Sequence, residues 1–294
     1  MRTYGILAGL TAASIWGGMY VVSKVVLDII PPFTLVSIRL ILGIGCLALI
    51  LALRGGFRAD KRQMGEAIGV GFIGFGISIG LQFLGTKLST AVNAALVTSA
   101  SPIFMVLFGV WLLGERLQLE RVVALVLATL GVIAVVDPGQ ALIGGVAFWG
   151  NMALFGAAVT WGLYSVLVKL VSQRLRVMEV SMYAFIGGLF VSIPLAGVEI
   201  MDIGLGEITT TVILGVLYLG LVSTALAMYL WNKSLALLEA GLVSVLFFAQ
   251  PIVGVGLGAI FLGEPMGLAF WIGAFLISTG LIITTRSKSP LGNV

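Results

Sequence analysis

The feature that most constrains this chain is a series of long apolar runs that follow one another almost without interruption. We count ten of them, each close to the length of roughly 20 residues that a helix needs to cross about 30 Å of hydrocarbon. They cover residues 4–26, 34–53, 67–85, 91–113, 120–137, 147–170, 180–198, 210–232, 241–262 and 267–285. Only 10% of the residues are charged, against about a quarter in soluble domains. The period-two alternation of a membrane barrel is absent, so the sequence predicts an all-α membrane protein with ten transmembrane helices.

The runs leave little of the chain outside the membrane. No room remains for a soluble domain or a nucleotide-binding fold, and we expect no nucleic-acid partner. There is no histidine, and Cys46, the only cysteine, lies inside a run where thiolate chemistry is not expected. We therefore expect no enzyme activity, no cofactor and no metal site. The first run is too long for the apolar core of a cleaved signal peptide, so we expect it to be retained as a helix.

The positive charges lie mainly on one side of the predicted bundle. With the N-terminus placed in the cytoplasm, thirteen of the sixteen Lys and Arg residues fall on the cytoplasmic side. The other side keeps Lys24, Arg39 and Lys87, together with half of the twelve Asp and Glu residues. Cytoplasmic loops of membrane proteins are enriched in Lys and Arg, so both termini are expected in the cytoplasm.

The chain also carries the same marks twice. The marks are a Pro, a Glu thirteen residues later and a Gly sixteen residues after that; they fall at Pro102, Glu115 and Gly131, and again at Pro251, Glu264 and Gly280. The pair Trp16-Gly17 likewise matches Trp161-Gly162, 145 residues further on. These matches predict two five-helix repeats, residues 1–140 and residues 141–294, the second with a short cytoplasmic tail. Because five is odd, the second repeat enters the membrane from the opposite face, and the halves are inverted.

This organisation resembles the drug/metabolite transporter superfamily, specifically its EamA-type members. The resemblance covers essentially the whole chain and rests on the early Trp-Gly, on the Pro followed by hydrophobic-Gly-Glu, and on the later Gly in each half. It implies a basket of helices around a central cavity that opens alternately to either side, in a family made up largely of exporters of amino acids and other small metabolites. It further implies the plasma (inner) membrane of a prokaryote, with the protein as a monomer or a homodimer.

Two tryptophans are the leading candidates for the cavity. Trp16 and Trp161 occupy equivalent positions near the middle of their helices, where an indole N–H needs a partner or water. Packing inside the bundle is the alternative. The other tryptophans lie near the ends of their runs and are expected to anchor at the headgroups; they are Trp111, Trp149, Trp231 and Trp271.

Polar and aromatic side chains at similar depth complete the predicted cavity. Aromatic rings would hold an apolar or planar group of the substrate, while amides and hydroxyls bind its polar end. The candidates besides the two tryptophans are Tyr20, Gln82, Ser99, Tyr164, Tyr229 and Gln250. For the serine, bonding within the helix bundle is the favoured alternative. For Tyr229 and its neighbour Asn232, solvation at the interface is an equal alternative.

The paired prolines and glutamates are candidates for moving parts. Pro102 and Pro251 each remove a backbone hydrogen bond near the middle of the membrane, which predicts a kink and a candidate hinge. Glu115 and Glu264 lie at helix ends on opposite faces. Each either lies in a capped or solvated turn or pairs across a gate in one conformation.

The middles of the runs lack the groups that couple transport to protons. None of the twelve Asp and Glu residues falls there, so facilitated diffusion or exchange is expected. Arg39 is expected to snorkel toward the outer surface, although it could instead draw an anionic group into an outer vestibule. The lack of a central cation argues against phosphate esters.

The sequence therefore predicts a transporter of small neutral metabolites, most often amino acids, working by alternating access. A drug or lipophilic-compound exporter of the same fold is the alternative. A non-transporting lipid-handling or assembly subunit is the alternative from another class.

Overall fold

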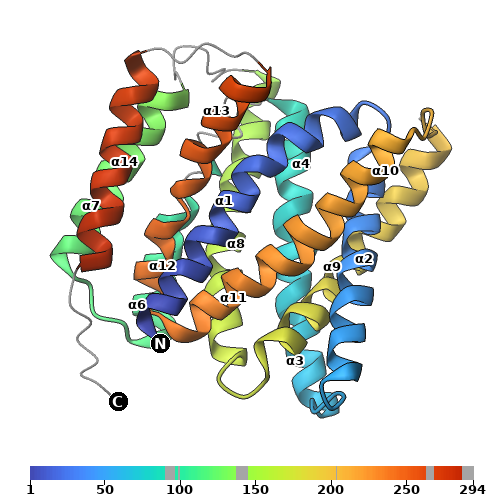
Figure 1. Cartoon of the computed structure of the whole chain (residues 1–294), viewed down its shortest axis with the longest axis horizontal. Helices are drawn as coiled ribbons and strands as arrows, with labels where there is room; N and C mark the ends of the chain where they lie inside the picture. The colour runs from blue at the N-terminus through green and yellow to red at the C-terminus, as the bar shows by residue number, and fades with distance from the viewer. Residues whose placement is uncertain (90–96, 99, 137–144, 203, 263–267, 287–294) are drawn as a thin grey trace.

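The computed structural model describes residues 1–89, 97–98, 100–136, 145–202, 204–262 and 268–286. Within these ranges the chain is helical and contains no strand (Figure 1). The first half comprises α1 (Arg2–Leu27), α2 (Pro32–Leu53), α3 (Lys61–Gly71), η1 (Phe72–Ser78), α4 (Ile79–Leu88), α6 (Ser101–Leu113) and α7 (Leu119–Val136). The second comprises α8 (Val146–Val171), α9 (Val177–Asp202), α10 (Thr210–Leu217), η3 (Tyr218–Leu226), α11 (Ala227–Leu237), α12 (Ala240–Leu246), α13 (Ala249–Leu262) and α14 (Leu268–Arg286).

These helices coincide with the predicted apolar runs over most of their described residues. Five segments are long and apolar enough to cross a membrane within the described ranges: Pro32–Leu53, Lys61–Gly85, Val146–Val171, Val177–Asp202 and Thr210–Leu237. Shorter apolar helices accompany them, among them α6. The expectation of an all-α membrane protein is confirmed, while the number of ten crossings stays a prediction.

A wider helical turn interrupts the third long helix of each half. The π-helical segment η1 joins α3 to α4, and η3 joins α10 to α11, 146 residues further along the chain. In η3 the Thr224 hydroxyl donates to the Leu219 carbonyl oxygen, five residues earlier, at 2.8 Å. Such π segments occur mostly as short interruptions and often at functional sites. The two π segments thus occupy equivalent positions in the two halves.

Close pairs of helices join the two halves of the chain. Figure 1 shows α7 beside α14 at one edge of the bundle, and α1 passes between α13 and α11. The repeated glycines explain the first pair. A Cβ atom at Gly131 would lie 2.7 Å from the Gly273 carbonyl oxygen, and one at Gly280 would lie 2.7 Å from the Ala124 carbonyl oxygen. Only glycine lets these two backbones approach so closely.

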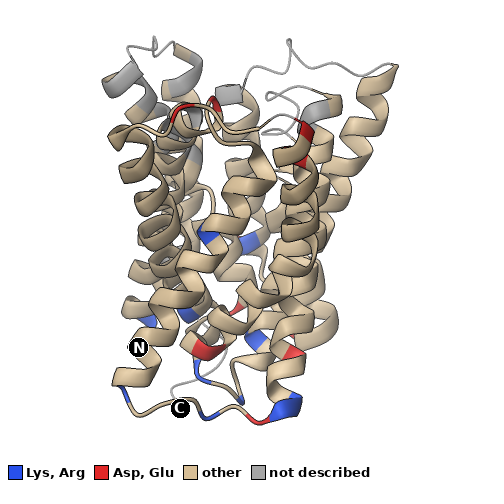
Figure 2. Ribbon diagram, turned by 90° about the vertical axis from the view of Figure 1, so that its right-hand side faces the viewer, with Lys and Arg blue, Asp and Glu red and all other residues tan. Residues whose placement is uncertain are grey.

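The bundle has two chemically different ends. Lys and Arg gather mainly at the end that carries the N-terminus, which we call the N-terminal end (Figure 2). Gly5, near the start of α1, lies against Leu238. Lys169, near the end of α8, donates to the Leu238 carbonyl oxygen at 2.5 Å. Helix α8 therefore ends where α1 begins, so the first helices of the two halves run in opposite directions.

Candidate functional site

The centre of the bundle holds a group of aromatic rings from both halves, which we call the central aromatic cluster. Its members are Trp16, Phe75, Trp161, Tyr164, Trp231 and Phe247. The ring centroids of Trp16 and Trp161 are 6.4 Å apart and nearly perpendicular. The Trp16 ring also lies 5.3 Å from Trp231 and 6.2 Å from Phe247. The two tryptophans that the sequence places at equivalent positions thus meet between the halves.

The indole N–H groups of this cluster are in different states. Trp16 Nε1 donates to the Ser223 carbonyl oxygen of η3 at 3.0 Å. The Nε1 atoms of Trp161 and Trp231 are buried and have no hydrogen-bond partner within the described residues. A buried donor without an acceptor costs about 1–3 kcal/mol. Water or a bound solute would supply the missing acceptor.

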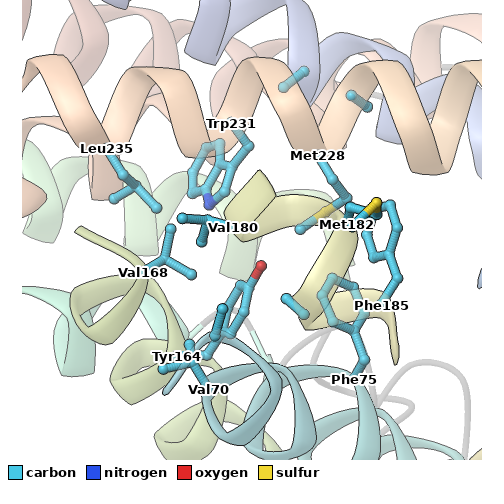
Figure 3. Close-up of a cluster of buried hydrophobic side chains, with 14 of the residues drawn as sticks. Val70, Phe75, Tyr164, Val168, Val180, Met182, Phe185, Met228, Trp231 and Leu235 are labelled. Atoms are coloured by element: carbon cyan, nitrogen blue, oxygen red, sulfur yellow. The ribbon is translucent and has the colours of Figure 1, made fainter. Parts of the chain in front are cut away.

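A buried polar chain runs beside the cluster. Asn232 Nδ2 donates to the Ser181 hydroxyl at 2.9 Å and lies 3.5 Å from the Tyr164 hydroxyl. Figure 3 shows the Tyr164 ring and the Trp231 indole pointing toward one another from α8 and α11. Asn232 is fully buried and bonded inside the bundle, so solvation at the interface, one of the two alternatives for this residue, does not hold.

Arg39 of α2 turns into the bundle beside this cluster. Its Nε donates to the Thr224 hydroxyl at 3.1 Å, and its Nη2 lies 3.5 Å from the Ser223 hydroxyl and 3.2 Å from the Met19 sulfur. The expectation that it snorkels to the surface is wrong, because these contacts hold the guanidinium between α1, α2 and η3. The bundle therefore does hold a cation, so the expected exclusion of phosphate esters on that ground no longer holds.

Ion pairs close the N-terminal end of the bundle. The Glu115 carboxylate accepts from Lys169 Nζ at 2.7 Å and from the backbone N–H groups of Ala240 and Gly241 at 2.7 and 3.1 Å. The two amides belong to the first turn of α12, where helix ends favour negative charge. Glu115 is therefore bound from α8 and α12 and does not lie in a solvated turn.

A second ion pair lies next to the first. Arg121 at the start of α7 pairs with Glu239, and both side chains are almost fully buried. The residue after Glu239 is Ala240, which binds Glu115. We call these two pairs the terminal lock, consisting of Glu115, Lys169, Arg121 and Glu239. It ties α6 and α7 of the first half to α8 and α12 of the second.

The remaining predicted cavity residues are distributed more widely. Gln250 is buried at the start of α13, and Gln82 is partly buried in α4. Tyr229 lies apart from the cluster and lines a cavity of about 440 Å³ near the N-terminal end, together with Arg54 and Lys233. Ser99 and Glu264 lie outside the described residues, as do the side chains of Tyr20 and Pro251.

The prolines start helices and do not kink them. Pro102 is the second residue of α6, and position 251 is the third residue of α13. In the first turn of a helix the missing N–H of proline has no partner to lose. A new helix therefore begins at each proline, whereas the sequence predicts a kink inside a continuous helix.

The sequence reasoning missed Trp231 and underrated Arg39. Trp231 was expected at a headgroup but is fully buried, whereas Trp111 and Trp149 are 75% and 68% exposed. One signal was available. Thr224, Met228 and Trp231 follow the spacing of one helix face, so the indole had to face the same way as the mid-membrane threonine.

Comparison with known proteins gives this architecture a family. A model described as the EamA-like transporter family matches residues 3–137 and again residues 148–286. An uncharacterized transporter, YetK, of Bacillus subtilis (strain 168) is 28% identical over 98% of this chain and 89% of its own. A probable amino-acid metabolite efflux pump of Escherichia coli (strain K12) is 30% identical over 96% of this chain and 94% of its own. A solved crystal structure at 23% identity superposes with a TM-score of 0.83 over 97% of each chain.

The family model matches both halves, and the relatives and the shared fold extend over nearly the full length. The repeated match also agrees with the duplicated Pro, Glu and Gly marks. The chain therefore belongs to the EamA-like transporter family and is a multi-pass membrane transporter.

Proposed function

We propose that this transporter moves small neutral amino acids, or metabolites closely related to them, by alternating access. One observation carries the proposal: Trp16 and Trp161, equivalent in the two repeats, meet at 6.4 Å in the middle of the bundle. Aromatic walls with a few polar groups are typical of sites for small partly apolar solutes. The unpartnered N–H groups of Trp161 and Trp231 add donors for a polar end.

The proposed topology has ten spans in two inverted halves, residues 1–140 and 141–294. The opposite directions of α1 and α8 support the inversion. The gathering of Lys and Arg at the N-terminal end supports a cytoplasmic location of that end (Figure 2). The protein would then lie in a prokaryotic plasma membrane with both termini inside the cell, as a monomer or a homodimer.

The substrate class draws support from relatives as well as from the cluster. Proteins named probable amino-acid metabolite efflux pumps, from Salmonella typhimurium and Escherichia coli, are 30% identical to this chain. Export or exchange down the gradient of the substrate fits the lack of carboxylates in the middle of the predicted spans.

The terminal lock bears on the alternating-access part of the proposal. In the proposed topology the lock joins the two halves at the cytoplasmic end, and alternating access requires this end to open in another conformation. Opening toward the cytoplasm would separate Glu115 from Lys169 and Arg121 from Glu239. Each separated charge would then face water in the opened vestibule, which lowers the cost of breaking the pairs.

Counterflow in proteoliposomes tests the proposal. Purified protein is reconstituted and assayed with a panel of amino acids, nucleobases and quaternary amines. Wild type should exchange neutral amino acids, and Trp16→Ala and Trp161→Ala should lower the rate at least tenfold because they remove rings that contact one another at the centre. Trp111→Ala is the matched control, since that ring is 75% exposed and lies outside the cluster.

The panel also separates the alternatives. Exchange of quaternary amines without amino acids would identify a lipophilic-cation exporter. Absence of flux for every solute, with correctly inserted protein, would favour a non-transporting membrane subunit. Normal amino-acid flux in both central variants would refute the role of the cluster.

A further inference from the structure

Arg39 is a cation inside the bundle whose contacts within the described part of the chain are all with neutral groups. It lies seven residues into α2, about 10 Å along the helix from Pro32. Its bonding partners are a threonine hydroxyl, a serine hydroxyl and a thioether sulfur, all neutral. Among the described residues no carboxylate pairs with it. Ionisable groups inside a membrane bundle are expensive and mark sites where something charged binds or passes.

The guanidinium is only partly satisfied. An arginine carries five N–H donors in a rigid fork. Nε and Nη2 contact neutral acceptors, of which the Met19 sulfur is weak and the Ser223 hydroxyl is at the limit of 3.5 Å. None of these three contacts involves Nη1. This leaves donors for an acceptor with two oxygen atoms, the shape of a carboxylate.

The surrounding helices hold the guanidinium in place. Gly43, one turn after Arg39 on the same face of α2, lets Thr224 approach, because a Cβ atom there would lie 3.3 Å from Thr224 Cγ2. Thr224 is itself bonded to the Leu219 carbonyl oxygen in the π turn. The Nε–Thr224 bond is therefore backed by a fixed hydroxyl.

Arg39 is also connected to the central aromatic cluster through one residue. Ser223 faces Arg39 with its hydroxyl and receives the Trp16 indole N–H at its carbonyl oxygen. A carboxylate bound to Arg39 would thus lie next to the Trp16 ring. A small amino acid fits this arrangement, with its carboxylate at Arg39 and its apolar side chain against the aromatic rings.

We propose that Arg39, with Ser223 and Thr224, binds the carboxylate of the transported solute and so determines specificity for amino acids over amines. The inference rests on the proposed function, since it names the group by which the substrate is recognised. It also assigns orientation: the carboxylate lies at α2 and η3, and the side chain lies against Trp16 and Trp161.

The second repeat offers no copy of this site. The position 145 residues after Arg39 is Ala184, which is fully buried and packed against α3. The paired tryptophans and π segments are thus common to both halves, but the cation is not. If Arg39 served only to hold the second helix of a repeat against the π segment, the same contact would be useful in both halves. Its occurrence in one half alone favours recognition of a single carboxylate.

Competition by four related compounds tests the inference on the wild-type protein. Counterflow of labelled leucine, or of the panel amino acid that exchanges fastest, is measured against leucine, leucinamide, 3-methylbutylamine and 4-methylpentanoate (or the matching derivatives). The last keeps the carboxylate and lacks the ammonium group. We expect 4-methylpentanoate to compete, and leucinamide and 3-methylbutylamine to compete about 10- to 100-fold more weakly than leucine, the loss of a charge-assisted hydrogen bond.

Variants then locate the effect. Arg39→Gln should remove the difference between leucine and leucinamide, and Arg39→Lys should retain part of it because the charge stays while the fork is lost. Arg62→Gln is the control, because that side chain is 84% exposed and its ion pair with Glu66 lies at the surface. Thermal unfolding and size-exclusion profiles check that each variant is folded.

The outcomes separate this inference from the proposed function. Amino-acid exchange with equal competition by leucine and leucinamide would overturn the role of Arg39 and leave the proposed function standing. A folded Arg39→Gln that keeps the full preference for the carboxylate would do the same. If wild type exchanges no amino acid but another solute, the proposed function fails and the inference with it. Should Arg39→Gln not fold, the wild-type comparison of acid and amide decides together with Arg39→Lys, in which an undiminished preference for the carboxylate would overturn the role of Arg39.

Discussion

The terminal lock predicts that one side chain controls which end of the bundle is open. Glu115 is the centre of the lock because it binds both Lys169 and the start of α12. The perturbation is Glu115→Ala. If the lock exists in only one conformation, its loss raises the free energy of that conformation and leaves the other unchanged.

The free-energy cost of Glu115→Ala follows from the polar groups that lose their partner. The Glu115 and Lys169 side chains are 9% and 16% exposed, so the pair is largely shielded from water. Without Glu115, Lys169 keeps the Leu238 carbonyl oxygen as its one acceptor among the described residues, and two amides of α12 lose their acceptor. Removing one member of a buried pair costs about 3–5 kcal/mol. At the lower figure the closed conformation loses about 100-fold in population relative to the open one.

Distances between spin labels report the change. In a Cys46→Ser background, labels at Leu117→Cys, between α6 and α7, and at Ala236→Cys, in α11, span the lock. Wild type should give one main distance, and Glu115→Ala should add a longer population that dominates. Glu115→Gln should fall between them, because it keeps an acceptor and loses the charge. Glu66→Ala, which breaks an exposed pair with Arg62, should leave the distribution unchanged.

The neighbouring pair provides the decisive refinement. The Arg121–Glu239 pair also joins the halves at this end, and Glu239 directly precedes the α12 amides that Glu115 binds, so the two pairs are expected to act together. The double variant Glu115→Ala with Glu239→Ala removes both. A distance distribution like that of wild type in the folded double variant would refute the reasoning that the lock closes this end.

Three further outcomes are expected. Gly131→Ala and Gly280→Ala should each destabilise the protein by about 1–3 kcal/mol in thermal unfolding, because the added methyl group pushes α7 away from α14. Gly65→Ala is the control and should be neutral or stabilising, because the space around Gly65 is open. Unfolding midpoints of Gly131→Ala and Gly280→Ala equal to that of wild type would refute the close approach. Glu199→Ala should cost about 1–2 kcal/mol, since its carboxylate accepts from the Phe33 and Thr34 amides at 3.0 and 2.8 Å at the start of α2; an unchanged midpoint would argue against that cap. Amino-acid exchange at a fixed substrate gradient should not follow an imposed pH gradient, because no carboxylate or histidine lies in the middle of the predicted spans; a substrate current that tracks the pH gradient would show proton coupling.

The helices were predictable because hydrocarbon thickness sets a length that the sequence must match. Their interruptions were not. The π turn in η3 depends on Thr224 bonding back to Leu219 and on the Trp16 N–H reaching the Ser223 carbonyl oxygen from 207 residues away. Partners so distant leave no periodic signal in the local sequence.

Depth along a helix was the weak step in predicting the site. The run 210–232 placed Trp231 at the end of its span, but α11 continues to Leu237, so the indole lies more than a turn inside the helix. Lys233 made the run look finished, although a lysine can extend its stem along a helix toward water. Trp16 and Trp161 were placed better because long apolar segments flank both.

The relation between the repeats explains which residues sequence comparison of the halves can identify. Positions that recur, such as the tryptophans and the glycines of α7 and α14, build an interface that both halves need. Arg39 does not recur, and Ala184 fills the equivalent place. A substrate with one carboxylate has no inversion symmetry, so a site that recognises it must break the symmetry of the fold. Residues that differ between the two repeats are therefore the better guide to specificity. Arg39 is the strongest of them, because it is charged and is bonded to neutral groups alone within the described residues.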